Sequence, residues 1–146
     1  MMGTRLQHLA THWLPLALWA GAIFFLSSRP VMPHVGPKLN ETDYWLDYAA
    51  HAAEFGVLCA LAWRAFRVSP AAWLSRRPAL AAWALSTLYA ALDEAHQAFV
   101  PGRMATLPDW LVDVAGAVLA AIVASLWVRR AQAADGGPPP RRRLAP

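Results

Sequence analysis

Four apolar segments separated by charged linkers constrain the fold of this chain more than any other feature. The segments run from about Trp13 to Leu26, from Tyr48 to Phe66, from Ala79 to Leu92 with an extension toward Phe99, and from Trp110 to Val128. A helix needs about 20 residues to cross the hydrocarbon core of a bilayer, and the segments with their polar flanks reach that length. The sequence has no period-two alternation, which argues against strands. It therefore predicts an all-α membrane protein, a bundle of four transmembrane helices.

The composition supports a lipid environment. Hydrophobic residues make up 58% of the 146 residues and charged residues 15%, whereas a soluble chain has roughly 25% charged residues. This argues against a water-soluble domain, a disordered chain or a disulfide scaffold. Cys59 lies inside an apolar segment and is interpreted as a small buried hydrophobic residue.

The basic residues predict the orientation. The linker between the second and third segments is basic and has no acid, whereas linkers 29–47 and 93–109 contain more acids than bases. The positive-inside rule then places both termini in the cytoplasm of a multi-pass inner-membrane protein. We expect residues 1–128 to form the membrane domain and residues 129–146 to form a disordered, basic, Pro-rich tail. Because the basic residues follow the apolar segments, membrane lipids are favoured as partners over nucleic acid.

The first segment has one alternative interpretation. Arg5 precedes it, and Ala20-Gly21-Ala22 has the outline of a signal-peptide cleavage site. The apolar run continues beyond this site through Leu26, which favours a retained helix.

Polar residues gather at the ends of the segments that are predicted to face outward. Helical spacing puts Asp47, His51 and Glu54 on one face of the second segment. A charge facing lipid costs about 2.5–3.5 kcal/mol on insertion scales, so Glu54 and Asp113 should point into the bundle. We expect a shared pocket formed by the following residues: Ser27, Ser28, Asp47, His51, Glu54, Asp93, Glu94, Gln97, Arg103, Asp109 and Asp113.

Several of these residues also have structural interpretations. Asp109 follows a proline and is suited to the first turn of a helix, and Asp47 is suited to a helix N-cap. Asp93 and Glu94 could form a solvated helix end, and Glu54 could be a buried ion-pair partner. No established metal signature such as H-E-x-x-H is present, so we predict neither a metal nor a cofactor.

The motifs resemble those of a known family. The run from Asp93 to Arg103, DEAHQAFVPGR, is similar to the DE-x-x-Q-x-F-x-x-x-R signature of the VanZ-like family. The other matching elements are Ser27-Ser28-Arg29-Pro30, then Asp47, His51 and Glu54-Phe55, and finally Asp109, Asp113 and Gly116. The resemblance covers about residues 15–128. Tyr48 stands where a lysine is common and Asp113 where an asparagine is common, which makes this pocket more acidic than usual.

The resemblance implies a small four-helix membrane protein, and the name-giving member is associated with low-level teicoplanin resistance. We therefore expect an envelope protein that binds or modifies an envelope lipid, a lipid-linked cell-wall intermediate or an amphiphilic glycopeptide antibiotic. One alternative is an intramembrane hydrolase or transferase in which the Asp, Glu and His side chains act as general acid and base. Another is a proton-coupled transporter, although four helices with polar groups at one end form no path across the bilayer. The sequence leaves the ligand and the oligomeric state open.

Overall fold

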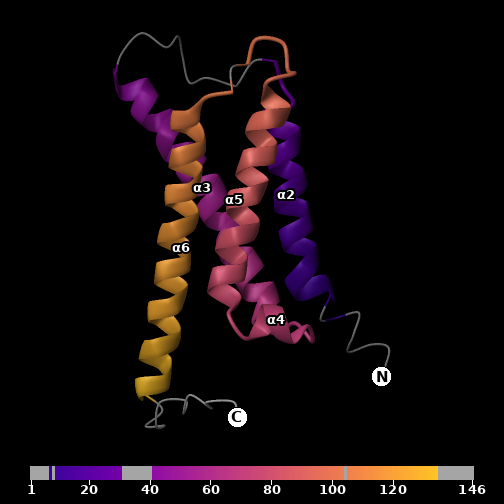
Figure 1. Ribbon diagram of the computed structural model, residues 1–146, viewed down its shortest axis with the longest axis vertical. Coiled ribbons are helices and arrows are strands. Elements are labelled where there is room, and N and C mark those ends of the chain that lie inside the picture. Colours follow the sequence, from indigo (N-terminus) through magenta and orange to yellow (C-terminus); the bar gives the residue numbers. More distant parts are fainter. Residues whose placement is uncertain (1–6, 8, 31–40, 104, 135–146) are drawn as a thin grey trace, which may run out of the picture.

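The computed structural model describes residue 7 and residues 9–30, 41–103 and 105–134 (Figure 1). All regular secondary structure in these ranges is helical, as predicted. The elements are a short π-helical turn η1 (Leu9–Trp13), α2 (Leu14–Ser27), α3 (Glu41–Phe66), α4 (Ala72–Ser75), α5 (Pro78–Gln97) and α6 (Leu107–Ala134).

Two helix boundaries differ from the sequence prediction. Helix α3 begins at Glu41 rather than near Tyr48, so Asp47 lies inside the helix and the N-cap interpretation is wrong. Helix α6 continues past Val128 to Ala134, so the described part of the expected tail is helical. Both extensions contain charged residues but no Gly or Pro. A charged residue interrupts an apolar segment, but it does not end a helix. Residues 135–146 of the expected tail lie outside the described residues.

Local sequence explains how the helices begin. Pro15 and Pro78 lie in the first turns of α2 and α5, where a missing backbone N–H costs nothing. Thr106 precedes α6, and its hydroxyl oxygen accepts a hydrogen bond from the Asp109 backbone N–H at 3.2 Å. This contact is an N-cap, and Asp109 follows in the first helical turn, as its structural interpretation predicted.

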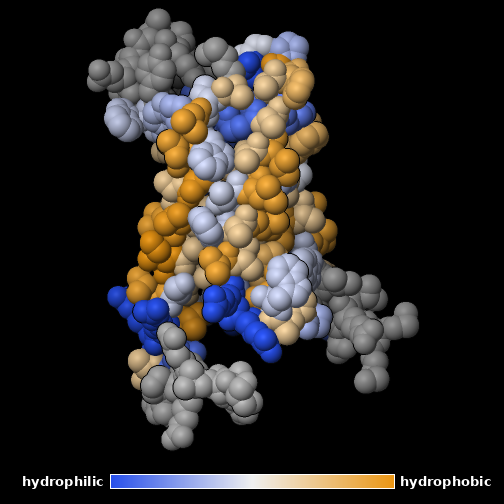
Figure 2. Space-filling model, in the orientation of Figure 1, coloured by the Kyte–Doolittle hydropathy of each residue, from blue (hydrophilic) through white to orange (hydrophobic). Residues whose placement is uncertain are grey.

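The four long helices run along the length of the molecule (Figure 1). The start of α2, α4 and the end of α6 lie together at one end, and the α5–α6 loop lies at the other. We call the first the basic end, defined by six exposed side chains: Arg64, Arg67, Arg76, Arg77, Arg129 and Arg130. We call the other the acidic end, defined by the following residues: His51, Glu54, Asp93, Glu94, Asp109 and Asp113. Figure 2 shows an apolar band between these two hydrophilic ends.

Two stretches of the described chain are long and apolar enough to cross a membrane. They are Ala10–Ser27, which includes α2, and Leu107–Ala134, which is α6. Helix α3 has 26 residues and α5 has 20, so at about 1.5 Å per residue each is at least as long as a hydrocarbon core is thick. These two helices contain most of the polar residues of the acidic end, which explains their lower hydropathy.

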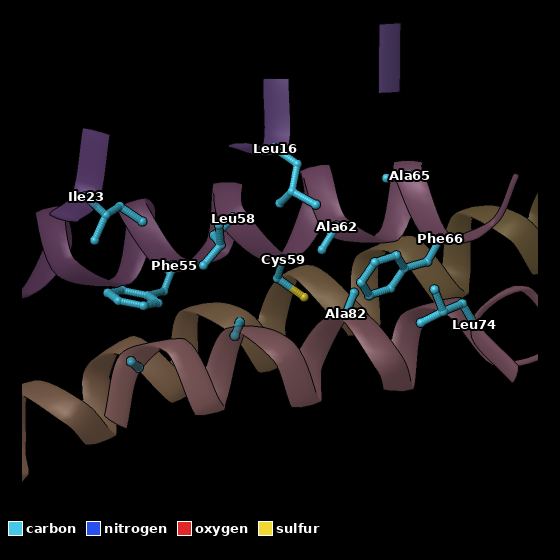
Figure 3. Packing of buried hydrophobic residues seen from close by; sticks show 12 residues of the cluster. Leu16, Ile23, Phe55, Leu58, Cys59, Ala62, Ala65, Phe66, Leu74 and Ala82 are labelled. Atoms are coloured by element: carbon cyan, nitrogen blue, oxygen red, sulfur yellow. The ribbon is translucent and has the colours of Figure 1, made fainter. Parts of the chain in front are cut away.

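The core is built around α3. Figure 3 shows Leu16 and Ile23 of α2 pointing toward α3, which contributes Phe55, Cys59 and Phe66 to the same cluster. Cys59 is fully buried, as its interpretation as a buried hydrophobic residue predicted. The core therefore lies in the apolar band and keeps the two polar ends apart.

Helices α3 and α6 meet backbone to backbone. A Cβ atom at Gly116 would lie 2.1 Å from the backbone oxygen of Ala52, and one at Gly56 would lie 3.4 Å from the oxygen of Gly116. No side chain fits at Gly116 unless the helices separate. The glycine at this position therefore brings α3 and α6 close together directly below the acidic end.

Candidate functional site

Asp93 is the acceptor at the centre of the acidic end. The hydroxyl of Ser27, the last residue of α2, donates to Asp93 Oδ1 at 2.6 Å, and the amide of Gln97 donates to Asp93 Oδ2 at 2.7 Å. All three side chains are more than nine-tenths buried. Asp93 and Gln97 are four residues apart on α5, so both lie on the face that meets α2.

His51 and Asp113 join α3 to α6. The Nδ1 atom of His51 lies 3.1 Å from Asp113 Oδ1. Asp113 is 1% exposed, and its Oδ2 atom has no hydrogen-bond partner among the described residues. Asp113 therefore points into the bundle, as the cost of a charge facing lipid predicted.

Glu94 holds the loop between α5 and α6. Its Oε2 atom accepts a hydrogen bond from the Thr106 backbone N–H at 2.8 Å. Its Oε1 atom is buried and has no partner among the described residues. Because Glu94 is 8% exposed, the solvated-helix-end interpretation is wrong for this residue, and likewise for Asp93.

Arg103 fastens the same loop to the end of α2. Its Nε atom donates to the backbone oxygen of Arg29 at 3.1 Å, and its Nη2 atom donates to that of Leu26 at 3.0 Å. Gly102 precedes it with φ of +83°, and a Cβ atom there would lie 2.9 Å from the oxygen of Pro30. The loop can therefore approach α2 only with glycine at this position.

A small cavity of about 10 Å³ lies inside this network. Its volume is close to that of one water molecule. Glu54 lines the cavity and forms no ion pair or side-chain hydrogen bond with another described residue, so its predicted role as an ion-pair partner is not observed. The lining residues are Ile23, Leu26, Ser27, His51, Glu54, Asp93, Gln97 and Arg103.

The structure places the other predicted residues around this centre. Ser28 lies beside the cluster, where its hydroxyl is 3.0 Å from His96 Nε2. Asp47 is half-buried on α3 and does not line the cavity. The described His, Cys, Asp and Glu side chains form no group that could hold a metal ion.

The candidate pocket predicted from the sequence did not include two contributors, His96 and Thr106. The sequence contains a signal for Thr106, because a threonine three residues before an aspartate is typical of a helix N-terminus. His96 follows Glu94 on α5, and its ring lies 4.7 Å from that of Phe24. Only the three-dimensional packing of α2 against α5 shows this contact.

Comparisons with known proteins agree with this architecture. The VanZ/LLP1 family model matches residues 12–128. This range includes all of α2, α3 and α5, α6 up to Val128, and all the residues of the acidic end. No curated protein and no solved structure is similar enough to count as a match. The family match and the apolar helices identify a membrane protein. With four-fifths of its length covered by the match, the chain belongs to the VanZ/LLP1 family.

Proposed function

We propose that α2, α3, α5 and α6 each cross the inner membrane, with the basic end in the cytoplasm and the acidic end facing outward. Helices α3 and α5 are long enough to span, and an apolar band separates the two polar ends in Figure 2. The exposed arginines of the basic end support the orientation by the positive-inside rule. In this topology both termini lie on the cytoplasmic side.

We further propose that the acidic end binds the polar headgroup of an envelope lipid, a lipid-linked cell-wall intermediate or an amphiphilic glycopeptide such as teicoplanin. One observation carries this proposal: two buried carboxylate oxygens, Glu94 Oε1 and Asp113 Oδ2, have no partner among the described residues. Unpaired buried acceptors are costly, so a ligand that donates hydrogen bonds to them gains that free energy. Hydroxyl and amine groups of a sugar or peptide headgroup are such donors.

Binding requires the site to open, because Glu94 and Asp113 are buried and the neighbouring cavity, which neither of them lines, has room for one water molecule. The contacts that close it are Ser27 with Asp93 and Arg103 with the carbonyl groups at the end of α2. Separation of α2 and the Arg103 loop from the other helices exposes the cavity from the outer surface. Arg103 is then free to bind a phosphate or carboxylate group of the ligand.

Native mass spectrometry of the full chain in mild detergent tests this proposal. Wild-type protein should retain a lipid adduct, and added teicoplanin should compete with it. Asp93→Asn should lose the adduct that teicoplanin displaces, because an amide NH2 donor replaces one of the two carboxylate oxygens that accept from Ser27 and Gln97. Asp47→Asn is the matched control, since this carboxylate does not line the cavity, and it should retain the adduct. Identical spectra for the three proteins would contradict the proposal.

An intramembrane hydrolase is the second candidate, and the water-sized cavity favours it. Glu54 and His51 line this cavity, and either could accept a proton from a water molecule held there. Glu54→Gln keeps the size of the side chain and removes the base. Hydrolysis of an envelope lipid that is lost in this variant while the lipid still binds would support the hydrolase. Absence of turnover by wild-type protein would leave binding as the function.

A transporter receives no support from the described residues. The core between the two ends contains Phe55, Leu58, Cys59 and Phe66, which offer no polar path across one copy of the chain. The polar residues with the deepest burial all lie near the acidic end, apart from Ser69 and Ser86.

A further inference from the structure

A second hollow lies between α5 and α6, away from the acidic end. It has a volume of about 460 Å³, within the range of roughly 300–1,000 Å³ typical of ligand pockets. Its walls are apolar, with Leu80 and Trp83 on α5 facing Val118 and Ile122 on α6. Ser125 also lines it, but its hydroxyl donates to the backbone oxygen of Ala121 in its own helix. The walls are therefore suited to hydrocarbon.

The groove leads to the basic end. It is lined by α6 from Val118 to Arg129, a stretch of roughly 16 Å at about 1.5 Å per residue. Arg129 lies at its end, opposite Ala79 in the first turn of α5. No acidic side chain among the described residues pairs with Arg129. An unpaired guanidinium thus lies at the polar end of an apolar groove.

The start of α5 adds a second source of positive charge at the same place. Pro78 is the first residue of the helix, and the side chain of Arg77 forms no cap hydrogen bond. The backbone N–H groups of an uncapped first turn carry partial positive charge and favour anions. Arg76 and Arg77 are exposed directly before this turn.

A groove between α3 and α6 offers a comparison with the first groove. It has a similar volume, about 510 Å³, and small residues such as Gly56, Ala60 and Ala120 line it. No charged side chain is among its lining residues, and at its basic end the Trp63 and Trp127 rings lie 5.8 Å apart. The Arg67 guanidinium lies over these two rings, at 5.0 and 5.7 Å from their centroids. The two grooves therefore differ in that Arg67 is engaged by aromatic rings outside its groove, whereas Arg129 lines its groove and stacks on no described ring.

We propose that the α5–α6 groove binds one acyl chain of an anionic glycerophospholipid, with the lipid phosphate held by Arg129 and the first turn of α5. An arginine binds phosphate with short, charge-assisted hydrogen bonds. A second copy of the chain is a poorer occupant, because the described charged side chains near the end of this groove, Arg76, Arg77, Arg129 and Arg130, are all basic. The proposed topology determines only which leaflet the groove faces. In that topology the groove faces the cytoplasmic leaflet, which is rich in anionic lipid.

A lipid titration of the full chain in neutral detergent tests this site. Phosphatidylglycerol and phosphatidylcholine with identical acyl chains are the two probes, and native mass spectrometry counts the bound molecules. Wild-type protein should prefer phosphatidylglycerol. Arg129→Gln should weaken its binding roughly tenfold, the loss of about one charge-assisted hydrogen bond. Arg130→Gln is the matched control, since Arg130 is exposed on α6 but does not line the groove.

A second pair of variants tests the apolar part of the site. Ile122 lines the α5–α6 groove and Val123 lines the α3–α6 groove, and both are about half exposed, at 50% and 57%. Ile122→Trp should fill the first groove and reduce phosphatidylglycerol binding, while Val123→Trp should leave it unchanged. Equal effects of the two variants would overturn the proposal.

The remaining outcomes are equally decisive. Equal binding of the two lipids by wild-type protein, or equal losses in Arg129→Gln and Arg130→Gln, would overturn the site whether or not a groove variant folds. Asp93→Asn, at the other end of the molecule, should leave phosphatidylglycerol binding intact. These experiments can therefore disprove the lipid site in the α5–α6 groove without affecting the proposed function at the acidic end. They can also disprove the proposed function without affecting the lipid site.

Discussion

Helix α2 and the three other long helices are held in different ways. Helices α3 and α6 meet through backbone contact at Gly116, and small residues such as Ala82, Ala90 and Ala117 are fully buried between α3, α5 and α6. Because lipid provides no hydrophobic drive between helices, close van der Waals packing of this kind stabilises helix pairs in a membrane. Three of the four helices therefore form a tight unit.

Helix α2 packs Leu16 and Ile23 into the core and is otherwise joined to this unit by hydrogen bonds from side chains. The indole of Trp19 donates to the backbone oxygen of Glu54 at 2.9 Å, and the hydroxyl of Tyr89 donates to that of Ala20 at 2.7 Å. Ser27 and Arg103 add the contacts at the acidic end. Such bonds are directional and few, so α2 can separate from the site while the three-helix unit stays packed. The predictions below measure this difference.

The largest effect should come from Gly116→Ala. Its methyl group would overlap the backbone oxygen of Ala52, so α3 and α6 must move apart. We expect a loss of about 3 kcal/mol or more in the free energy of unfolding, as for severe overpacking. Unfolding in detergent followed by circular dichroism measures it.

The control for this variant lies on α2. A Cβ atom at Gly21 would have nothing within 4 Å, so Gly21→Ala should be neutral or should stabilise the helix by up to about 1 kcal/mol. If the two variants had equal stability, the distinction between the packed unit and α2 would be wrong.

The next largest effect is expected from Asp93→Ala. The substitution leaves the Ser27 hydroxyl and the Gln97 amide buried without their acceptor. Each unsatisfied buried group costs about 1–3 kcal/mol in soluble proteins and less in membranes, so we expect a total of about 2 kcal/mol. Asp47→Ala, measured by the same unfolding assay, should have a smaller effect. A larger loss for Asp47→Ala would show that the acidic end is not organised around Asp93.

The sequence predicted part of the acidic end but not how its residues pair. The cost of a charge facing lipid predicted that Glu54 and Asp113 point into the bundle, and helical spacing placed His51 on the same face as Glu54. Pairing depends on the rotation and tilt of each helix, which the apolar pattern does not determine. His51 therefore pairs with Asp113, while Arg103 binds backbone carbonyl groups and none of the described acids.

Helix boundaries and backbone contacts were hard to predict for a related reason. The length of an apolar segment reflects the thickness of the bilayer, whereas the length of a helix depends on the helix propensity of its residues. Helices α3 and α6 therefore extend beyond their apolar segments. Gly116 matched a motif position, but its role in the contact with Ala52 depends on where two helices cross. Such crossings are set by packing, which a single sequence does not display.

A local effect is expected from Arg103→Gln. The variant loses two bonds to the backbone oxygens of Leu26 and Arg29, worth about 1 kcal/mol in total by membrane values. Hydrogen exchange should become faster in the α5–α6 loop and at the end of α2, and should not change in the middle of α6. Arg29→Gln is the control, because the Arg29 guanidinium lies over the Phe25 ring at 4.4 Å. Uniformly faster exchange across all helices would show that α2 does not open separately.

The smallest effect should come from Tyr89→Phe, which removes the bond between α5 and the backbone of α2 at Ala20. Side-chain hydrogen bonds between membrane helices average about 0.6 kcal/mol. The loss of stability is small because Ala20 lies inside α2. Its backbone oxygen therefore keeps its helical hydrogen bond after the Tyr89 hydroxyl is removed. Tyr48→Phe is the control, since its hydroxyl bonds to no other described residue. A cost for Tyr89→Phe equal to that of Asp93→Ala would mean that α2 is fixed along its whole length, and the closed cavity could then not open by displacement of this helix.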